Sequence, residues 1–377
     1  MSTLKVDAIR HNSATSDAIT TAADGTCTAK LTSIGGGQLS HRNVIINGAM
    51  TVAQRGTSST TANAYSTVDR NQIRTSGVDE APTISQSDVA SGTTPYTLGF
   101  RKAFKITNGN QTGGAGAADY IWWDHRLEAQ DIANSGWNYT SSSSYITFSF
   151  WIKSSVAQTF KGYLRSIDGT TQQYPFETGS LSADTWTKIT KSIPGNSNLT
   201  FDNDNAMGLQ INIFAFYGTD VTDNSVTENA WSAFASSARM KNNTSTWYTT
   251  NDATLEMTGF QLEVGDTATT FEHRSFAEEK KRCERYYQTY GFTTLMGSLA
   301  GAVGTPRILF PTEMRDTPSV TVEYGSNGNG SFRNQNDGST LTGHTTFNYY
   351  TNGFDCRGSS GSANIIYSST YKAAAEL

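Results

Sequence analysis

Tryptophan and tyrosine side chains set among polar residues are the groups in this sequence best suited to recognising a ligand. Sugars present apolar C–H faces that stack on flat rings, and neighbouring Asn, Asp and Ser side chains hydrogen-bond their hydroxyl groups. Loops and strand faces of a rigid β-scaffold can carry shallow sites of this kind. Any one ring can instead fill a core or a subunit interface, so the set predicts one or two exposed ring platforms. The candidate glycan-binding residues are Trp122, Trp123, Trp137, Tyr139, Trp151, Trp231, Trp247 and Tyr248.

Two oxygen-rich stretches, 202–205 and 220–224, could hold a cation. Carboxylate and amide oxygens are ligands that calcium prefers, and neither stretch has the spacing of an EF-hand loop. Asp and Asn are also ordinary turn formers, so calcium binding and simple turn formation both stay open. The candidate metal ligands are Asp202, Asp204, Asp220 and Asp223.

The sequence has no recognisable signature of catalysis. The glycine-rich, nucleophile and zinc-binding motifs of common enzyme classes do not occur, and the five histidines are scattered singly. A pair of carboxylates at the separation needed for glycoside hydrolysis cannot be recognised in a sequence. The chain is therefore predicted to bind without catalysing a reaction, and cleavage of a polysaccharide is the less favoured alternative.

Cysteine usage and the first residues bear on where the chain is made. Cys27, Cys283 and Cys356 are far apart and odd in number, which fits neither a metal site nor a disulfide framework. Residues 1–10 do not combine a basic start with an apolar core, so no signal peptide is expected. Free thiols and synthesis in the cytosol are predicted, with a disulfide between chains as the alternative.

Composition narrows the class of protein further. Charged residues make up 16% of the 377 residues, against about 25% in an average soluble protein, while aromatic residues reach 11%. Disordered chains are poor in aromatics and highly charged, so the composition argues against wholesale disorder. The sequence has no run of about 18 apolar residues that could insert into a membrane as a helix. A net charge of −5 argues against a nucleic-acid partner.

Short runs with a period of two dominate the chain from residue 43 onward and predict β-strands. In 145–153 the aliphatic and Phe residues fall on one face, while Trp151 lies on the other face with Ser149 and Lys153. About eight to ten such runs without intervening helices predict an antiparallel β-sandwich or jelly roll. The main runs are 44–46, 68–74, 103–107, 120–123, 160–166, 186–193, 208–216 and 253–264.

Four parts are expected along the chain. Residues 1–42 have too few apolar groups for a private core and contain brief strands, a turn at Asp24-Gly25 and a hinge at 35–37. Residues 43–275 form the sandwich, with a helical turn at 228–235. Residues 276–291 form a linker helix. Residues 292–377 form a small mainly β domain with strands at 308–311, 319–324, 345–350 and 364–372, separated by loops at 325–340 and 357–363.

The linker helix has a clear start and stop signal. Ser275 is a candidate N-cap and Glu278 completes a capping box. Glu278 and Arg282 form an i,i+4 pair. Gly291 stands where a left-handed residue would end the helix.

Several segments resemble receptor-binding tail fibre or tail appendage proteins of bacteriophages, especially marine and cyanobacterial ones. The opening 2–9, STLKVDAI, is similar to the start of such proteins, and 43–56, NVIINGAMTVAQRG, to the entry of their central module. Further matching segments are VDR at 68–70, SFWIKS at 149–154, TWTK at 185–188, IPG at 193–195, TGFQLEVG at 258–265, FEHRS at 271–275, RCERYY at 282–287, MRDTP at 314–318 and AAEL at 374–377.

The resemblance implies a central domain like a carbohydrate-binding module and a place in the virion tail. It implies a homotrimer attached to other tail proteins through 1–42, with the distal domain facing a bacterial surface glycan such as lipopolysaccharide. No sugar-contact positions follow from it, because the matching segments are scaffold segments. A structural adaptor that joins the tail to another fibre is the alternative, and it would bury 292–377 against a further virion protein.

Overall fold

The computed structural model describes residues 6–10, 12, 19–25, 27–29, 41–296, 303–342, 345–359 and 365–377. Near the N-terminus it contains a small antiparallel sheet of β1 (Ala8–Ile9), β2 (Ile19–Thr21) and β3 (Cys27–Ala29). The brief strands and the turn predicted for this segment are therefore confirmed, and Gly25 has a φ of 85° in that turn. The hinge predicted at 35–37 lies outside the described residues.

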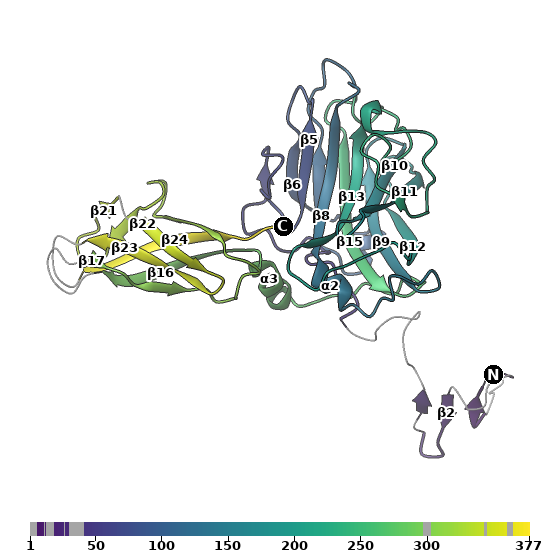
Figure 1. Ribbon diagram of the computed structural model, residues 1–377, viewed down its shortest axis with the longest axis horizontal. Helices are drawn as coiled ribbons and strands as arrows, with labels where there is room; N and C mark the ends of the chain where they lie inside the picture. The colour runs from purple at the N-terminus through teal and green to yellow at the C-terminus, as the bar shows by residue number, and fades with distance from the viewer. Residues whose placement is uncertain are drawn as a thin grey trace.

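Two six-stranded antiparallel sheets form the sandwich (Figure 1). We call the sheet with the order β12-β9-β15-β7-β6-β4 sheet I and the sheet with the order β14-β11-β10-β13-β8-β5 sheet II. Sheet I contains β4 (Ser58–Ser59), β6 (Thr83–Asp88), β7 (Lys102–Thr107), β9 (Tyr145–Ser154), β12 (Thr187–Pro194) and β15 (Thr254–Val264). Sheet II contains β5 (Gln72–Ser76), β8 (Tyr120–Glu128), β10 (Thr159–Ser166), β11 (Gln172–Ser180), β13 (Met207–Tyr217) and β14 (Ser232–Ala233).

The chain crosses repeatedly between the two sheets, as in a jelly roll. The strand β7 of sheet I is followed by β8 of sheet II, then by β9 of sheet I and by β10 and β11 of sheet II. Only short helices interrupt the strands of the sandwich: α1 (Thr94–Thr97), α2 (Ala129–Ala133) and the 3-10 helix η1 (Thr219–Val221). The mainly β, antiparallel sandwich predicted from the sequence is confirmed.

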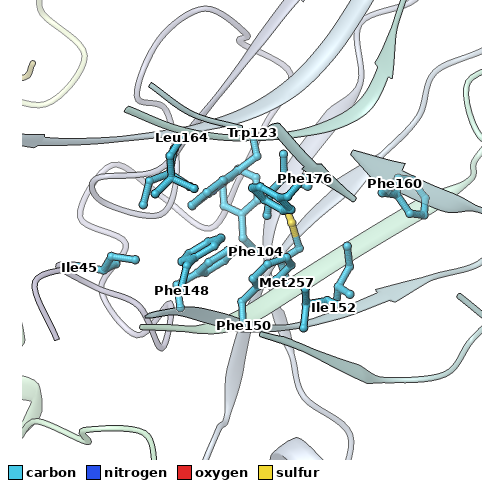
Figure 2. Close-up of a cluster of buried hydrophobic side chains, with 14 of the residues drawn as sticks. Ile45, Phe104, Trp123, Phe148, Phe150, Ile152, Phe160, Leu164, Phe176 and Met257 are labelled. Carbon is cyan, nitrogen blue, oxygen red and sulfur yellow. The ribbon is translucent and has the colours of Figure 1, made fainter. Parts of the chain in front are cut away.

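Aromatic and aliphatic side chains from both sheets fill the space between them (Figure 2). Trp123 of sheet II and Phe260 of sheet I stack with ring centroids 4.3 Å apart and planes within 9°. On β9 the predicted alternation is confirmed, because the inward residues are fully buried and Trp151 lies on the outer face. The inward residues are Ile146, Phe148, Phe150 and Ile152.

Some strand predictions need correction. Residues 44–46 form a loop, held to sheet I by a hydrogen bond from the Val44 amide to the Leu262 carbonyl at 3.0 Å. The helical turn predicted at 228–235 is instead a turn followed by β14. The strands β6 and β11 were not predicted, because β6 is mostly polar and β11 contains Pro175.

Helix α3 (Phe276–Glu284) begins as predicted, with the Ser275 hydroxyl oxygen accepting a 3.2 Å hydrogen bond from the Glu278 amide. The prediction that the helix continues to 291 is wrong. The residues from Tyr287 onward form β16 (Tyr287–Met296), which pairs along its whole length with β24 (Ile365–Ala374). The aromatic and Thr residues of β16 favour a strand, and the long pairing with β24 outweighs the helical spacing of the sequence.

The distal part contains the strands after α3, and it has its own cluster of buried side chains between Ile308 and Ala375. Its β18, β19, β22 and β24 match the predicted runs, whereas β20 lies inside the stretch expected to be a loop at 325–340 and β21 begins at the last residue of that stretch. Cys356 in this cluster and Cys283 in α3 are buried free thiols, as predicted. The strands between β16 and β24 are β17 (Val303–Gly304), β18 (Arg307–Leu309), β19 (Ser319–Glu323), β20 (Phe332–Asn334), β21 (Thr340–Leu341), β22 (Thr345–Tyr350) and β23 (Gly353–Ser359).

The chain returns to the sandwich after β24 (Figure 1). Glu376 forms ion pairs with Arg70 at 2.5 Å and with Arg55 at 2.9 Å. Arg315 of the distal part donates a 2.6 Å hydrogen bond to the Ala375 carbonyl. These contacts connect the sandwich to the distal part through charged groups, of which Arg70 is buried and the others are half-buried. Within the described ranges, no helix is long and apolar enough to cross a membrane.

Candidate functional site

Four of the predicted glycan-binding residues are buried, which corrects their assignment. Trp123, Trp137, Trp247 and Tyr248 are at most 3% exposed, so they cannot offer a ring face to a sugar. Their polar atoms are also satisfied inside the protein, which is the usual condition for burying such rings. The acceptors are Asn71 Oδ1 for Trp123, the Ser144 carbonyl for Trp137, the Thr254 carbonyl for Trp247 and Asp119 Oδ2 for Tyr248.

Two of the four half-buried candidates also serve packing. Tyr139 lies edge-on to Phe201, with centroids 5.0 Å apart. The Trp231 indole donates a 2.7 Å hydrogen bond to the Pro194 carbonyl. The remaining two, Trp122 and Trp151, lie on the outer faces of sheets II and I respectively.

Trp151 lines an open groove of about 810 Å³ on the outer face of sheet I. Of the eight predicted rings, Trp151 is the one among the residues that line this groove. A volume of a few hundred to a thousand Å³ suits a small molecule or a short oligosaccharide. The lining residues are Thr97, Leu98, Gly99, Phe100, Ser149, Trp151, Lys188, Gly259, Ala268, Thr269, Thr270, Phe271 and His273.

Strand register places a polar group on either side of the Trp151 ring. In the antiparallel pairs of sheet I, Trp151 lies opposite Lys188 on β12 and opposite Thr258 on β15. Directly opposed side chains on one face have Cβ atoms about 5 Å apart. Ser149 lies one step along the same face of β9. The Thr258 hydroxyl is buried and donates a 2.7 Å hydrogen bond to the Lys102 carbonyl. The polar groups that line the groove beside the Trp151 ring are therefore Lys188 and Ser149.

A bulge in β15 makes room for the opposite wall of the groove. The register between β15 and β9 shifts between Thr258 and Gln261, and Gly259 in the bulge has a φ of 66°. A Cβ atom at Gly259 would lie 2.7 Å from Cζ of Phe100. Only glycine therefore allows the Phe100 ring to lie against this part of the strand.

Phe100, Phe271 and His273 form that aromatic wall. Phe271 lies 4.9 Å from Phe100 and from His273, measured between ring centroids. His273 Nε2 donates a 2.8 Å hydrogen bond to the Leu98 carbonyl, which fixes the imidazole. Sequence reasoning missed this wall. Phe271 and His273 belong to 271–275, one of the segments whose resemblance is to scaffold, and nothing in the sequence brings Phe100 to them.

Substituting alanine at Gly259 tests the bulge. We expect Gly259→Ala to lower the free energy of unfolding by about 2–3 kcal/mol, because a left-handed backbone strain of about 1–2 kcal/mol adds to the contact with Phe100. Gly92→Ala is the matched control, since Gly92 has a φ of 83° but no atom within 4 Å of the added Cβ. Urea unfolding of both variants gives the difference. Equal losses would show that Phe100 does not depend on Gly259.

The outer face of sheet II is covered. Trp122 packs edge-on to Phe214 at 5.2 Å, and the segment after β13 places the fully buried Met240 beside Phe214 and Tyr163. Burial raises the pKa of Tyr163 to about 12 and lowers that of Arg239. The polar atoms on this face that find no hydrogen-bond partner within the described chain include Trp122 Nε1, Asn212 Oδ1 and Gln173 Oε1. The aromatic and polar residue types of this face are those that bind glycans, but the face is not open to a ligand in this structure.

The four candidate metal ligands act in turns. Asp204 Oδ1 accepts from the Ala206 amide at 3.0 Å, and Asp223 Oδ1 accepts from the Ser225 amide at 2.7 Å. That bond lowers the pKa of Asp223. The Asp202 amide donates to Asp168, and Asp220 lies in η1. Nowhere in the described chain do three or more His, Cys, Asp or Glu side chains gather to hold a metal, so the calcium prediction gains no support from these loops.

A second hollow, of about 360 Å³, lies beside His41 and Asp131. Burial raises the pKa of Asp131 to about 6. Burial alone would raise the pKa of Glu128 as well, but hydrogen bonds from Arg285 and Tyr286 leave it lowered. Glu128 is completely buried under these partners. The two carboxylates therefore do not face one another across an open cleft, as a glycosidase pair must.

No protein-family model matches the sequence, and no curated protein matches it. Among solved structures, the chain is similar to the enzymatically active domain of tailspike protein 4 from bacteriophage CBA120, with 9% identity over 59% of this chain and a TM-score of 0.31. It is similar to a xylanase 10B fragment from Clostridium thermocellum with modules CBM22-1 and GH10, with 10% identity over 54% of this chain and a TM-score of 0.25. It is also similar to the CBM22-1–CBM22-2 tandem of Paenibacillus barcinonensis Xyn10C, with 9% identity and a TM-score of 0.26.

The extent of these similarities differs. The chain spans 21% of the tailspike domain and 27% of the xylanase fragment. The similarity to the tandem covers 92% of this chain and 92% of the tandem. At these identities and TM-scores, the similarities say nothing about what the present chain binds.

Proposed function

We propose that this protein binds a glycan, without cleaving it, in the groove beside Trp151. The observation that carries the proposal is the half-buried indole in an 810 Å³ groove, with Lys188 opposite it across the sheet and Ser149 beside it on β9. A sugar ring stacking on the indole would bury its apolar face and leave its hydroxyl groups to these polar neighbours. Binding sites of this kind are mostly apolar with a few placed polar groups.

We further propose that the glycan belongs to a bacterial surface and that the protein is a phage tail component acting as a homotrimer. The support is the resemblance of segments such as 43–56 and 258–265 to phage tail appendages, together with the small apolar content of residues 1–42. Residues 1–42 of three copies could together bury an apolar core that this segment of a single copy cannot form. Three grooves on one particle would convert weak single-site affinity into strong avidity.

The experiment compares two tryptophans on opposite faces of the sandwich. Wild type, Trp151→Ala and Trp122→Ala are applied to an array of bacterial surface polysaccharides, and affinities for the bound glycans follow by calorimetry. We expect Trp151→Ala to lower affinity by about tenfold or more, since a lost stacking contact of about 1.4 kcal/mol is tenfold. Trp122→Ala should bind as wild type does.

Three outcomes would contradict the proposal. If the wild-type protein binds no glycan at any valency, the proposed glycan binding is wrong and the alternative role as a structural adaptor stands. Loss of binding in Trp122→Ala alone would move the site to sheet II. Release of reducing ends from a bound polysaccharide would make the protein a depolymerase.

A further inference from the structure

Lys188 brings a positive charge to the groove that a neutral sugar would leave unpaired. Its side chain is exposed on β12 beside Trp151, and it has no ion-pair partner within the described residues. The only other ionisable residue that lines the groove is His273, and no Asp or Glu lines it. The groove therefore presents a positive group that the protein itself does not neutralise.

The carboxylates nearest in register are engaged elsewhere. Glu256 on β15 pairs with Lys153 at 2.9 Å. Glu263, further along β15, accepts hydrogen bonds from the Thr269 amide at 2.8 Å and the Thr269 hydroxyl at 2.7 Å. Neither carboxylate is left free to pair with Lys188 or to repel an anionic ligand.

We infer that the groove selects an acidic sugar, a hexuronic acid unit whose carboxylate pairs with Lys188 while its ring stacks on Trp151. The inference rests on the proposed function, because it names the glycan class that the same groove prefers. Its physical basis is charge complementarity between an unpartnered ammonium group and a sugar carboxylate. The pair would be sheltered by the Trp151 ring on one side, which reduces its screening by water and salt.

The positions of Trp151 and Lys188 separate the contribution of ring stacking from that of charge pairing. The indole of Trp151 contacts the apolar face of the ring, which acidic and neutral pyranoses share. Lys188 lies opposite Trp151 across the β9–β12 pair, so its ammonium group reaches the edge of a ring placed on the indole. Trp151 should therefore set affinity for sugars in general, and Lys188 should set the preference for the charged form.

A matched pair of ligands tests this directly. Tetragalacturonic acid and its fully methyl-esterified form differ in charge and share the same ring. Calorimetry with wild type, Lys188→Gln and Trp151→Ala measures both affinities at low and at high salt. Lys281→Gln is the control, since Lys281 is an exposed residue of α3 outside the groove and its loss changes the net charge by the same amount.

We expect wild type and Lys281→Gln to bind the acid about fivefold or more tightly than the ester at low salt, as for one half-exposed ion pair. Lys188→Gln should bind both forms equally, and Trp151→Ala should lose both. Equal binding of acid and ester by wild type, with binding still lost in Trp151→Ala, would overturn the selection for acid and leave the groove as a neutral glycan site. Failure of wild type to bind the acid would also overturn the inference. Failure of every glycan on the array, by contrast, would overturn the proposed function itself.

Discussion

Glu376→Gln is expected to lower the free energy of unfolding by about 3–5 kcal/mol, the usual cost of removing one partner from a buried ion pair. Arg70, its partner, is 1% exposed, and its guanidinium stacks 3.5 Å from the Tyr286 ring. Without the carboxylate, Arg70 would keep a buried charge with only the Arg126 carbonyl as a strong acceptor. All tryptophans lie between residues 122 and 247, so urea unfolding followed by tryptophan fluorescence reports on the sandwich.

Two further variants make the experiment specific. Glu323→Gln removes the carboxylate of an ion pair with Lys372 whose side chains are 29% and 47% exposed, and it should cost less than about 1 kcal/mol. The double variant Arg70→Met with Glu376→Gln should recover much of the loss, because it no longer buries an unpaired charge. A loss in Glu376→Gln no larger than that in Glu323→Gln would show that the return of the chain to the sandwich adds no stability.

Trp123→Ala is expected to destabilise the sandwich by about 3–5 kcal/mol, as large-to-small changes of buried aromatic residues do. Its ring is completely buried and stacks on Phe260 across the two sheets. The same substitution at Trp151, whose ring is half-buried on the outer face, should cost about 1 kcal/mol. Thermal unfolding of the two variants provides the comparison. Equal costs would mean that the rings are not divided between core and surface as described.

This contrast also shows how far the sequence could predict the site. The run 145–153 alternates cleanly, so the outward direction of Trp151 was correctly predicted from its period. In 120–123 the residues Ile121, Trp122 and Trp123 are apolar on both faces, and the period cannot decide which indole enters the core. The register of β8 against β13 decides it.

The rest of the groove depends on contacts between distant residues. Phe100, Phe271 and Gly259 meet only because the bulge in β15 is placed against the turn after α1. A single sequence carries no signal for that meeting. The end of α3 is a similar case: its N-cap is local and was predicted, whereas its early end at Glu284 results from the pairing of β16 with β24, about 80 residues away in sequence.

Composition alone cannot show which outer face of the sandwich is open to a ligand, because the covered face of sheet II has similar residue types. Polar and aromatic residues gather there as well, for example Trp122 and Asn212, but the segment that carries Met240 lies over them. The sequence shows the residue types of both faces, whereas the accessibility that separates them is a property of the folded chain.

Nuclear magnetic resonance of the tryptophan indole N–H groups tests the central claim most directly. The isotope-labelled protein is titrated with a glycan that it binds on the array. We predict that the Trp151 signal, assigned from its absence in Trp151→Ala, shifts with ligand concentration, while the signals of the buried Trp123, Trp137 and Trp247 stay unchanged. A bound glycan that leaves the Trp151 signal in place and moves that of Trp122 would contradict the groove as the binding site.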